Sequence, residues 1–252
     1  TYADAMERYG SDKPDLRIPL ELVTVDAWAS SLDFKVFSGP AQDELGRVAV
    51  VRVPNAASMS RKEIDELGAH AAKYGAKGLA WMKVNQAQQG VEGVQSSFSK
   101  FLDDAKVNDL LSQLEAREGD LLLFGAGARL QVNDFMGAVR LKVGKDRGLL
   151  QEGWKPLWVV DFPMFEWDED SQRWFALHHP FTAPKVDDSA HLAADPGNAV
   201  SRAYDMVLNG TEIGGGSIRI HENPMQQVVF ELLGIKEEEA NERFGFLLEA
   251  LK

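Results

Sequence analysis

A short stretch near the carboxyl-terminal end of the sequence, TEIGGGSIR (211–219), combines residue types that could do chemistry. It opens with the carboxylate of Glu212 and closes with the guanidinium of Arg219. Three glycines lie between these two groups: Gly214, Gly215 and Gly216. Because glycine weakens the interior of a strand, such a run indicates a place where a ligand or another backbone approaches closely. The stretch predicts a strand that offers an acid and a base to a ligand.

A second carboxylate, Asp205, precedes this stretch on the same predicted β-hairpin. The Asn-Gly pair at 209–210 is a strong two-residue turn signal. Simple pairing across that turn puts Val207 opposite Glu212 and Asp205 opposite Gly214, so the two carboxylates become diagonal neighbours on one face. Diagonal side chains lie about 7–8 Å apart, and such a pair beside glycines could hold Mg²⁺ on a phosphate. The alternative is a solvent-facing acidic pair.

The position of Arg219 needs an irregularity in the strand. Arg219 follows Glu212 by seven residues, and strict alternation would place the two side chains on opposite faces. A β-bulge, which glycines readily supply, would bring both onto one pocket. Arg219 could then bind a substrate carboxylate through two hydrogen bonds. The alternative is a surface arginine paired with an acid.

The dipeptide His178–His179 comes at the end of a predicted strand over 173–181. Neighbours on a strand point to opposite faces, so the two imidazoles are a poor pair for one metal ion. One of them could enter a pocket as a hydrogen-bond donor while the other packs. The alternative is that both histidines are structural.

The elements that must position these residues predict an α+β fold. The first part of the chain alternates helices and strands, and the later part is richer in strands. The predicted elements before residue 151 are helices at 1–10, 60–75, 104–117 and 130–142 and strands at 47–54, 78–84 and 120–127. After residue 151 they are strands at 155–168 and 173–181, the hairpin at 203–221, a helix at 223–234 capped by Asn223, and an amphipathic helix at 236–252.

Composition limits the possible function. The 252 residues include no cysteine, which excludes disulfides, thiolate metal ligands and cysteine nucleophiles and fits a cytosolic protein. No apolar run is long enough to span a membrane. The net charge of −12 is uneven, with 18 acidic and 8 basic residues in 151–252 against 17 acidic and 16 basic in 18–150. A long-range basic field for nucleic acid is therefore absent.

Taken together, these stretches resemble the bacterial type of aspartyl-tRNA synthetase, a family of class II enzymes. The resembling stretches are YGSDKPDLR (9–17), FKVFSGP (34–40), YGAKGLAW (74–81), GWKPLWVVDFPMFE (153–166), HHPFTAPK (178–185) and YDMVLNGTEIGGGSIRIH (204–221). The resemblance implies part of an antiparallel-sheet catalytic domain at 1–17 and 151–252. It implies an inserted α+β module at 18–150, of the kind also found in amidotransferase B subunits.

The resemblance also implies roles for the candidate residues. Asp205 and Glu212 look like the acids that hold Mg²⁺ on ATP, and the three glycines look like the floor of the ATP site. Arg219 resembles the arginine that grips the side-chain carboxylate of L-aspartate, with His178 and its neighbour His179 beside that pocket. No covalent intermediate is implied, so no nucleophile is expected. The implied partners are ATP, L-aspartate, the aspartate tRNA and a second subunit, in the cytoplasm and away from membranes.

Departures from the family pattern lead to a further expectation. The anticodon-binding barrel and the family's three signatures are not found, so we expect an internal segment that cannot aminoacylate by itself. Whether the parent also charges the asparagine tRNA stays open. An alternative is a non-catalytic tRNA- or protein-binding module in which the basic run RLKVGKDR (140–147) touches phosphates. An amidotransferase B subunit would share only the middle module, and asparaginyl and lysyl enzymes lack it.

Overall fold

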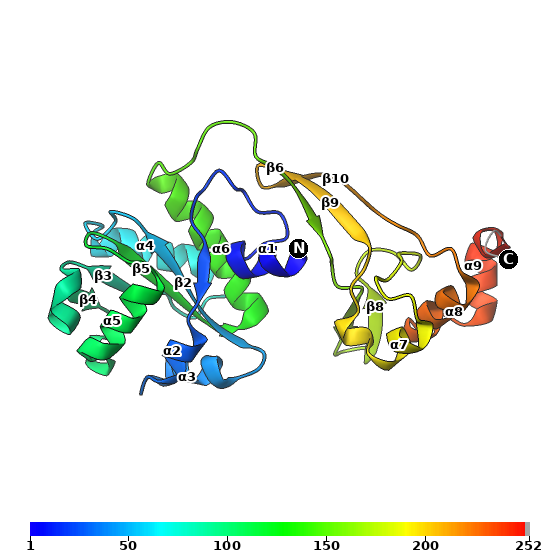
Figure 1. Ribbon diagram of the computed structural model, residues 1–252, viewed down its shortest axis with the longest axis horizontal. Coiled ribbons are helices and arrows are strands. Elements are labelled where there is room, and N and C mark those ends of the chain that lie inside the picture. The colour runs from blue at the N-terminus through cyan, green and yellow to red at the C-terminus, as the bar shows by residue number, and fades with distance from the viewer. Residues whose placement is uncertain (250–252) are drawn as a thin grey trace. The chain divides into compact units, whose positions relative to one another are not determined.

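The computed structural model describes residues 1–249 and divides the chain into two compact units (Figure 1). One unit is Asp4–Lys155, and the other joins Thr1–Ala3 to Pro156–Lys252. The segment 4–17, which the resemblance assigns to the surrounding domain, thus belongs to the first compact unit. The idea that residues 18–150 are a module inserted into a catalytic domain stays a prediction.

The first unit is built on a five-stranded antiparallel sheet with the strand order β1-β2-β5-β3-β4. Its strands are β1 (Leu22–Thr24), β2 (Gly46–Val53), β3 (Ala80–Val84), β4 (Val94–Ser96) and β5 (Leu121–Ala128). Its helices are α1 (Tyr2–Tyr9, which starts in the other unit), α2 (Asp26–Ser30), α3 (Lys35–Gln42), α4 (Arg61–Ala72), α5 (Asp104–Gln113) and α6 (Arg129–Asp146), with 3₁₀ turns η1 (Ala87–Gly93) and η2 (Ser99–Phe101).

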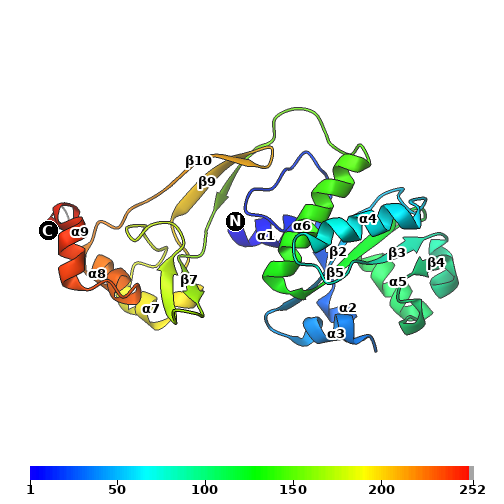
Figure 2. The ribbon, with the colours of Figure 1, turned by 180° about the vertical axis from the view of Figure 1, so that it is seen from behind.

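Helices cover both faces of this sheet, and alternation along the strands explains why. On β2, Ala49 and Val51 enter a core that α4 and α6 share, whereas Val48 and Val50 enter a second core with α2, α3 and α5. Figure 2 shows α4 and α6 in front of the sheet. The nearly continuous apolar run of β2 is therefore what a strand buried on both faces requires.

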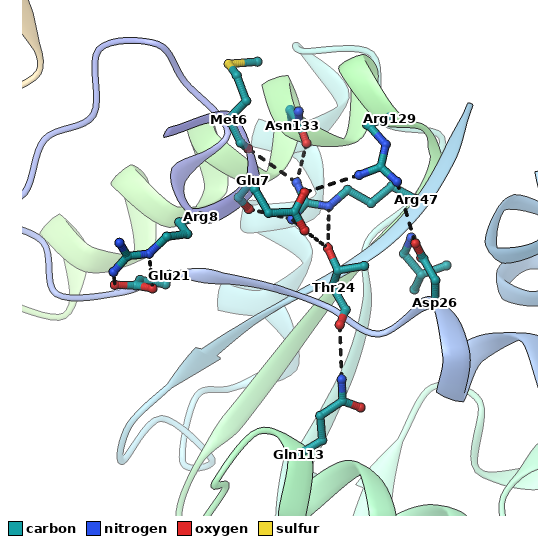
Figure 3. A network of polar contacts seen from close by, with 11 residues as sticks. Met6, Glu7, Arg8, Glu21, Thr24, Asp26, Arg47, Gln113, Arg129 and Asn133 are labelled. Carbon is teal, nitrogen blue, oxygen red and sulfur yellow. Dashed lines mark hydrogen bonds and ion pairs between the residues drawn. The ribbon is translucent and has the colours of Figure 1, made fainter. Parts of the chain in front are cut away.

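A buried arginine closes the carboxyl-terminal end of α1 (Figure 3). Arg47 on β2 has no exposed surface and donates to the carbonyl oxygens of Met6 (3.4 Å) and Glu7 (2.6 Å). These belong to the last turn of the helix, whose carbonyls have no partner inside the helix. Arg47 also bonds the side chains of Thr24 and Asn133 and pairs with the Glu7 carboxylate at 3.1 Å. Burial lowers the pKa of Arg47 from its high ordinary value, so the bonds must compensate for lost hydration.

A second buried arginine fixes the chain between α1 and β1. Arg140 on α6 donates to the carbonyl oxygens of Asp15 (2.9 Å), Ile18 (2.6 Å) and Leu20 (2.5 Å). Its guanidinium also lies over the ring of Tyr9, 4.9 Å from the centroid. Three carbonyl groups of an irregular segment are thereby satisfied by one side chain.

The second unit carries two smaller sheets. A three-stranded antiparallel sheet has the order β10-β9-β6, and a two-stranded sheet pairs β7 with β8. The strands are β6 (Pro156–Val160), β7 (Phe165–Asp168), β8 (Arg173–Ala176), β9 (Ala203–Leu208) and β10 (Thr211–Ser217). The helices are α7 (Ser189–Ala194), η3 (Pro196–Asn198), α8 (Asn223–Leu232) and α9 (Glu237–Glu249).

The core of the second unit lies between the two-stranded sheet and the carboxyl-terminal helices. Met164, Phe165 and Leu192 pack with Met225 and Val229 of α8. A separate aromatic group joins Phe181, Phe230 and Phe244, with ring centroids 5.3–5.8 Å apart. None of the helices in the described range 1–249 is long and apolar enough to cross a membrane.

Three details of the sequence prediction are wrong. The predicted strand at 155–168 is two strands, because the chain leaves the sheet at Asp161, whose φ is +63°, and Pro163 follows. The predicted strand at 173–181 ends at Ala176. Asn223 does not cap α8: Glu222 holds the N-cap position without a side-chain hydrogen bond. The last three residues of the predicted terminal helix, 250–252, lie outside the described residues.

Candidate functional site

The hairpin of β9 and β10 forms as predicted and contains a bulge (Figure 1). Asn209 and Gly210 both have positive φ, +53° and +84°, as a two-residue hairpin turn requires. Thr211 and Glu212 pair with Leu208 and Val207 in the predicted register. The register then shifts between Glu212 and Gly214, which leaves Ile213 as the extra residue.

This bulge changes which side chains face each other. Asp205 pairs with Gly215, so the predicted pairing with Gly214 is wrong by one residue. Asp205 and Glu212 still lie on the same face. Glu212 is opposite Val207, and Asp205 is two residues from Val207 on the same strand, so the side chains of Asp205 and Val207 point to one face. Beyond the bulge, Gly215 and Ser217 continue that face to the end of β10. The same alternation, continued for two more residues, would put Arg219 in phase with Glu212.

The three glycines are not equivalent. A Cβ atom on Gly215 would lie 2.2 Å from Oδ1 of Asp205, and one on Gly216 would lie 2.9 Å from the hydroxyl of Tyr204. Cross-strand side chains therefore fold over these two glycines. A Cβ atom on Gly214 would meet nothing within 4 Å. No other atom of this chain therefore fills the space next to Gly214.

A loop of residues 177–185 lies along the strand extension that carries Arg219. Thr182 and Arg219 form an isolated antiparallel bridge. The N–H of Ala183 donates to the carbonyl of Ile218 (2.8 Å), and the hydroxyls of Thr182 and Ser217 are 3.3 Å apart. The loop that carries both histidines therefore runs beside Arg219, and the charge of Arg219 acts on His179. Both histidines lie beyond the end of β8.

The two histidines have different surroundings, as the sequence suggested, but for a reason other than strand alternation. The ring of His178 packs edge-on against Phe162, with centroids 4.8 Å apart. Nδ1 of His179 accepts a hydrogen bond from the N–H of Phe181 (3.2 Å). Partial desolvation of the ring and then the charge of Arg219 hold the pKa of His179 below its ordinary value. At neutral pH His179 is therefore uncharged, with its remaining proton on Nε2 as a donor.

The candidate residues are accessible to a ligand. His178, His179, Glu212 and Arg219 are exposed, and Asp205 is half-buried. Such exposure contrasts with Arg47 and Arg140 of the other unit, which are buried and donate to groups of their own chain. The arrangement provides a guanidinium, a neutral imidazole donor and two carboxylates along one strand pair and its adjoining loop.

The donors fit a magnesium ion that is shared with phosphate groups. Residues 1–249 contain no group of three or more His, Asp or Glu side chains placed to hold a metal ion. Mg²⁺ is commonly bound through one or two carboxylates plus substrate phosphates and water. Asp205 and Glu212, on one face beside glycines, supply that smaller number of oxygen ligands.

Thr182 and Ser217 were missed by the sequence prediction, although they contact each other between the histidine loop and the glycine strand. Thr182 directly follows HHPF in the sequence, so the motif itself was the available signal. Their contact depends on a pairing between segments about 35 residues apart, which no local pattern specifies.

Most basic side chains of the run 140–147 contact groups within their own unit. Arg140 is buried against backbone carbonyls, and Lys142 pairs with Asp146 at 2.8 Å. Arg147 donates to the carbonyl of Asn55 (3.1 Å). Three of its basic side chains therefore have partners within the chain, which weakens the prediction that this run touches phosphates.

Comparison with known proteins gives one family over the whole chain. The family model described as tRNA synthetases class II (D, K and N) matches residues 1–252. The "Aspartate--tRNA ligase" of Stenotrophomonas maltophilia (strain K279a) is 61% identical over 251 residues, and that of Xanthomonas campestris pv. campestris (strain B100) is 59% identical. Each alignment covers 100% of this chain and 42% of the relative, so the chain spans less than half the length of these proteins.

Proposed function

The chain belongs to the family of class II tRNA synthetases (D, K and N), and we propose that it is a segment of an aspartate–tRNA ligase. The complete enzyme activates L-aspartate with ATP and transfers it to the aspartate tRNA. Support comes from the names of relatives that are about 60% identical over the whole segment. The observation that carries the proposal is the bulge at Ile213, because alternation continued past the end of β10 would then put Arg219 in phase with Glu212.

The proposed chemistry has two steps. The α-carboxylate of aspartate attacks the α-phosphate of ATP and releases pyrophosphate, and the terminal hydroxyl of the tRNA then attacks the carbonyl of the adenylate. Neither step needs a nucleophilic side chain, so catalysis depends on positioning and charge neutralisation. Arg219 reads the side-chain carboxylate of aspartate through two charged hydrogen bonds. His178 and His179 complete the wall of that pocket, where His179 offers its Nε2 proton.

Gly214, Gly215 and Gly216 form the floor on which ATP lies. Of the three, Gly214 leaves the open space for close approach, because cross-strand side chains cover the other two. Asp205 and Glu212 would hold Mg²⁺, which neutralises phosphate charge when it is bound. The segment lacks more than half of the length of its relatives, and we expect no aminoacylation by the segment alone. The homodimer, the cytoplasmic location and a role with the asparagine tRNA stay predictions.

Amino-acid-dependent exchange between ATP and pyrophosphate in the full-length enzyme tests the proposal. Exchange with aspartate but not asparagine is expected for the wild type. Arg219→Ala should lower kcat/KM for aspartate by about 100-fold, since truncating one partner of a charged pair costs a few kcal/mol. Arg243→Ala, an exposed arginine on α9 paired with Glu239, is the matched control and should leave exchange unchanged. A wild type without aspartate-dependent exchange would overturn the proposal.

A further inference from the structure

Residues 161–164, which we call the clasp segment, connect to both ends of the histidine loop at 177–185. At the start of the loop, the N–H of Leu177 donates to the carbonyl of Met164 (3.1 Å), and His178 packs on the ring of Phe162. At the end of the loop, Nζ of Lys185 pairs with Oδ1 of Asp161. Both ends of the loop thus contact one short piece of chain. The last residues of the loop also form backbone hydrogen bonds with the neighbouring segment, from Lys185 to Val200 and from Arg202 to Ala183.

The backbone of the clasp segment is held in place by residues 199–201, which lie between η3 and β9. The N–H of Ser201 donates to the carbonyl of Phe162 (2.8 Å), and the N–H of Met164 donates to the carbonyl of Ala199 (2.8 Å). The Phe162 and Met164 side chains are buried. The clasp segment is therefore a fixed support, against which the more exposed loop can be positioned.

Asp161 has a left-handed backbone conformation, with a φ of +63°. Glycine adopts this conformation without cost, and Asp and Asn adopt it more readily than other residues that have a side chain. Asp161 therefore combines a tolerated turn conformation with a carboxylate, and a residue in this region is a starting point for a functional hypothesis. The contact that the carboxylate makes is the ion pair with Lys185.

Folding stability alone is a poor explanation for this ion pair. The side chains of Asp161 and Lys185 are 25% and 51% exposed, and exposed ion pairs contribute about 0–1 kcal/mol to stability. The middle of the same loop bridges to Arg219 through Thr182. A shift of the loop would therefore move His178 and His179 relative to Arg219.

We propose that Asp161 and Lys185 are positioning residues for the aspartate pocket: their ion pair sets the loop that places His178 and His179 beside Arg219. This inference rests on the proposed function. Neither residue touches the substrate, and both act through the loop. Small displacements of positioning groups have large effects on reactivity, which makes the pair testable by kinetics.

Steady-state exchange kinetics in the full-length enzyme test the inference. Asp161→Asn keeps the tolerance for positive φ but removes the charge, and Lys185→Met removes the partner charge. Each should raise KM for aspartate by about tenfold, with kcat and the KM for ATP within about twofold. Lys185→Arg keeps the charge and should retain the wild-type KM. The melting temperature should change by less than about 4 °C in every variant.

The control variant is Glu239→Gln, which breaks an exposed ion pair on α9 in the same unit. It should leave both KM values unchanged. A merely structural pair would instead lower the melting temperature and the active fraction while KM for aspartate stays at the wild-type value, and that result would overturn the inference. A wild type that shows no aspartate-dependent exchange would overturn the proposed function itself.

Discussion

The two compact units use arginine in opposite ways. In the unit of residues 4–155, Arg47 and Arg140 are buried and donate to carbonyl oxygens of their own chain. In the unit of residues 156–249, Arg219 is exposed beside a glycine strand and a histidine loop. A guanidinium whose donors are all used inside the fold stabilises that fold, whereas an exposed one beside open space can bind a ligand.

The two regions also differ in net charge. Residues 18–150 are nearly neutral, with 17 acidic and 16 basic residues, whereas residues 151–252 carry 18 acidic and 8 basic residues. An acidic region repels anionic substrates over long distances. If it binds ATP and aspartate as proposed, single positive groups such as Arg219 must offset this repulsion locally. We therefore expect electrostatic effects in this unit to be concentrated at single residues.

The largest expected effect separates the two kinds of arginine. Arg47→Met should destabilise its unit by about 3 kcal/mol, because acceptors such as the Glu7 carbonyl and Oδ1 of Asn133 lose their donor. Arg219→Ala should change stability by less than about 0.5 kcal/mol. Hydrogen exchange of the β2 and β5 amides, together with urea unfolding of the whole chain, measures both. Equal effects of the two substitutions would contradict the comparison.

The next effect lies within the glycine strand. Gly215→Ala should destabilise the protein by about 1 kcal/mol, because its Cβ would displace the Asp205 carboxylate, which is the movable end of a half-buried side chain. Gly214→Ala should be neutral or slightly stabilising, since nothing lies near the new methyl group and alanine restricts the unfolded chain. Urea unfolding of the two variants distinguishes them. If Gly214→Ala alone weakens ATP binding in the full-length enzyme, the open space is used by the ligand.

An effect of similar size distinguishes two helix starts. Ser60→Ala should cost about 1 kcal/mol, because Ser60 and Glu63 form a complete capping box at the start of α4. Asn223→Ala should cost less than about 0.5 kcal/mol, since Glu222 holds the N-cap position of α8 and Asn223 makes no capping bond. Thermal unfolding measures both differences. A larger loss for Asn223→Ala would mean that the cap of α8 differs from the one described.

The smallest effect concerns the titration of His179. Its pKa is below the ordinary value of about 6.5 because of partial desolvation of the ring and the charge of Arg219. Arg219→Ala should raise that pKa, and Arg243→Ala should not, as NMR of the imidazole resonances would measure. The folded state takes up this proton less readily than the unfolded state, so falling pH below about 6.5 disfavours folding at this residue. An unchanged pKa in Arg219→Ala would remove Arg219 from this interaction.

Local signals in the sequence predicted much of this fold. The capping box of Ser60 and Glu63 and the Asn-Gly turn at 209–210 depend only on neighbouring residues, and both are confirmed. The family resemblance is also confirmed. The exact site of the bulge was beyond prediction, because several glycine-rich registers satisfy the same pattern. Ile213, rather than a glycine, is the extra residue.

Other errors arose from contacts between distant residues. Arg140 looks like part of a basic surface run, but its partners are carbonyl groups about 120 residues earlier in the sequence. The break of the predicted strand at Asp161 depends on a single left-handed residue that carries no glycine signal. The roles of the candidate site residues stay predictions, since they concern ligands and segments beyond this chain.

The extra residue at Ile213 also sets a rule for changes in the length of this strand. Glu212 and Arg219 are an odd number of residues apart, and the extra residue compensates for that odd spacing in the alternation of side chains. Whether the two side chains share a face therefore depends on whether the segment between them changes in length by an even or an odd number of residues. An engineered insertion of two residues there can preserve the facing of both groups, whereas the loss of one residue reverses it. Variation in length at this strand should therefore occur in pairs.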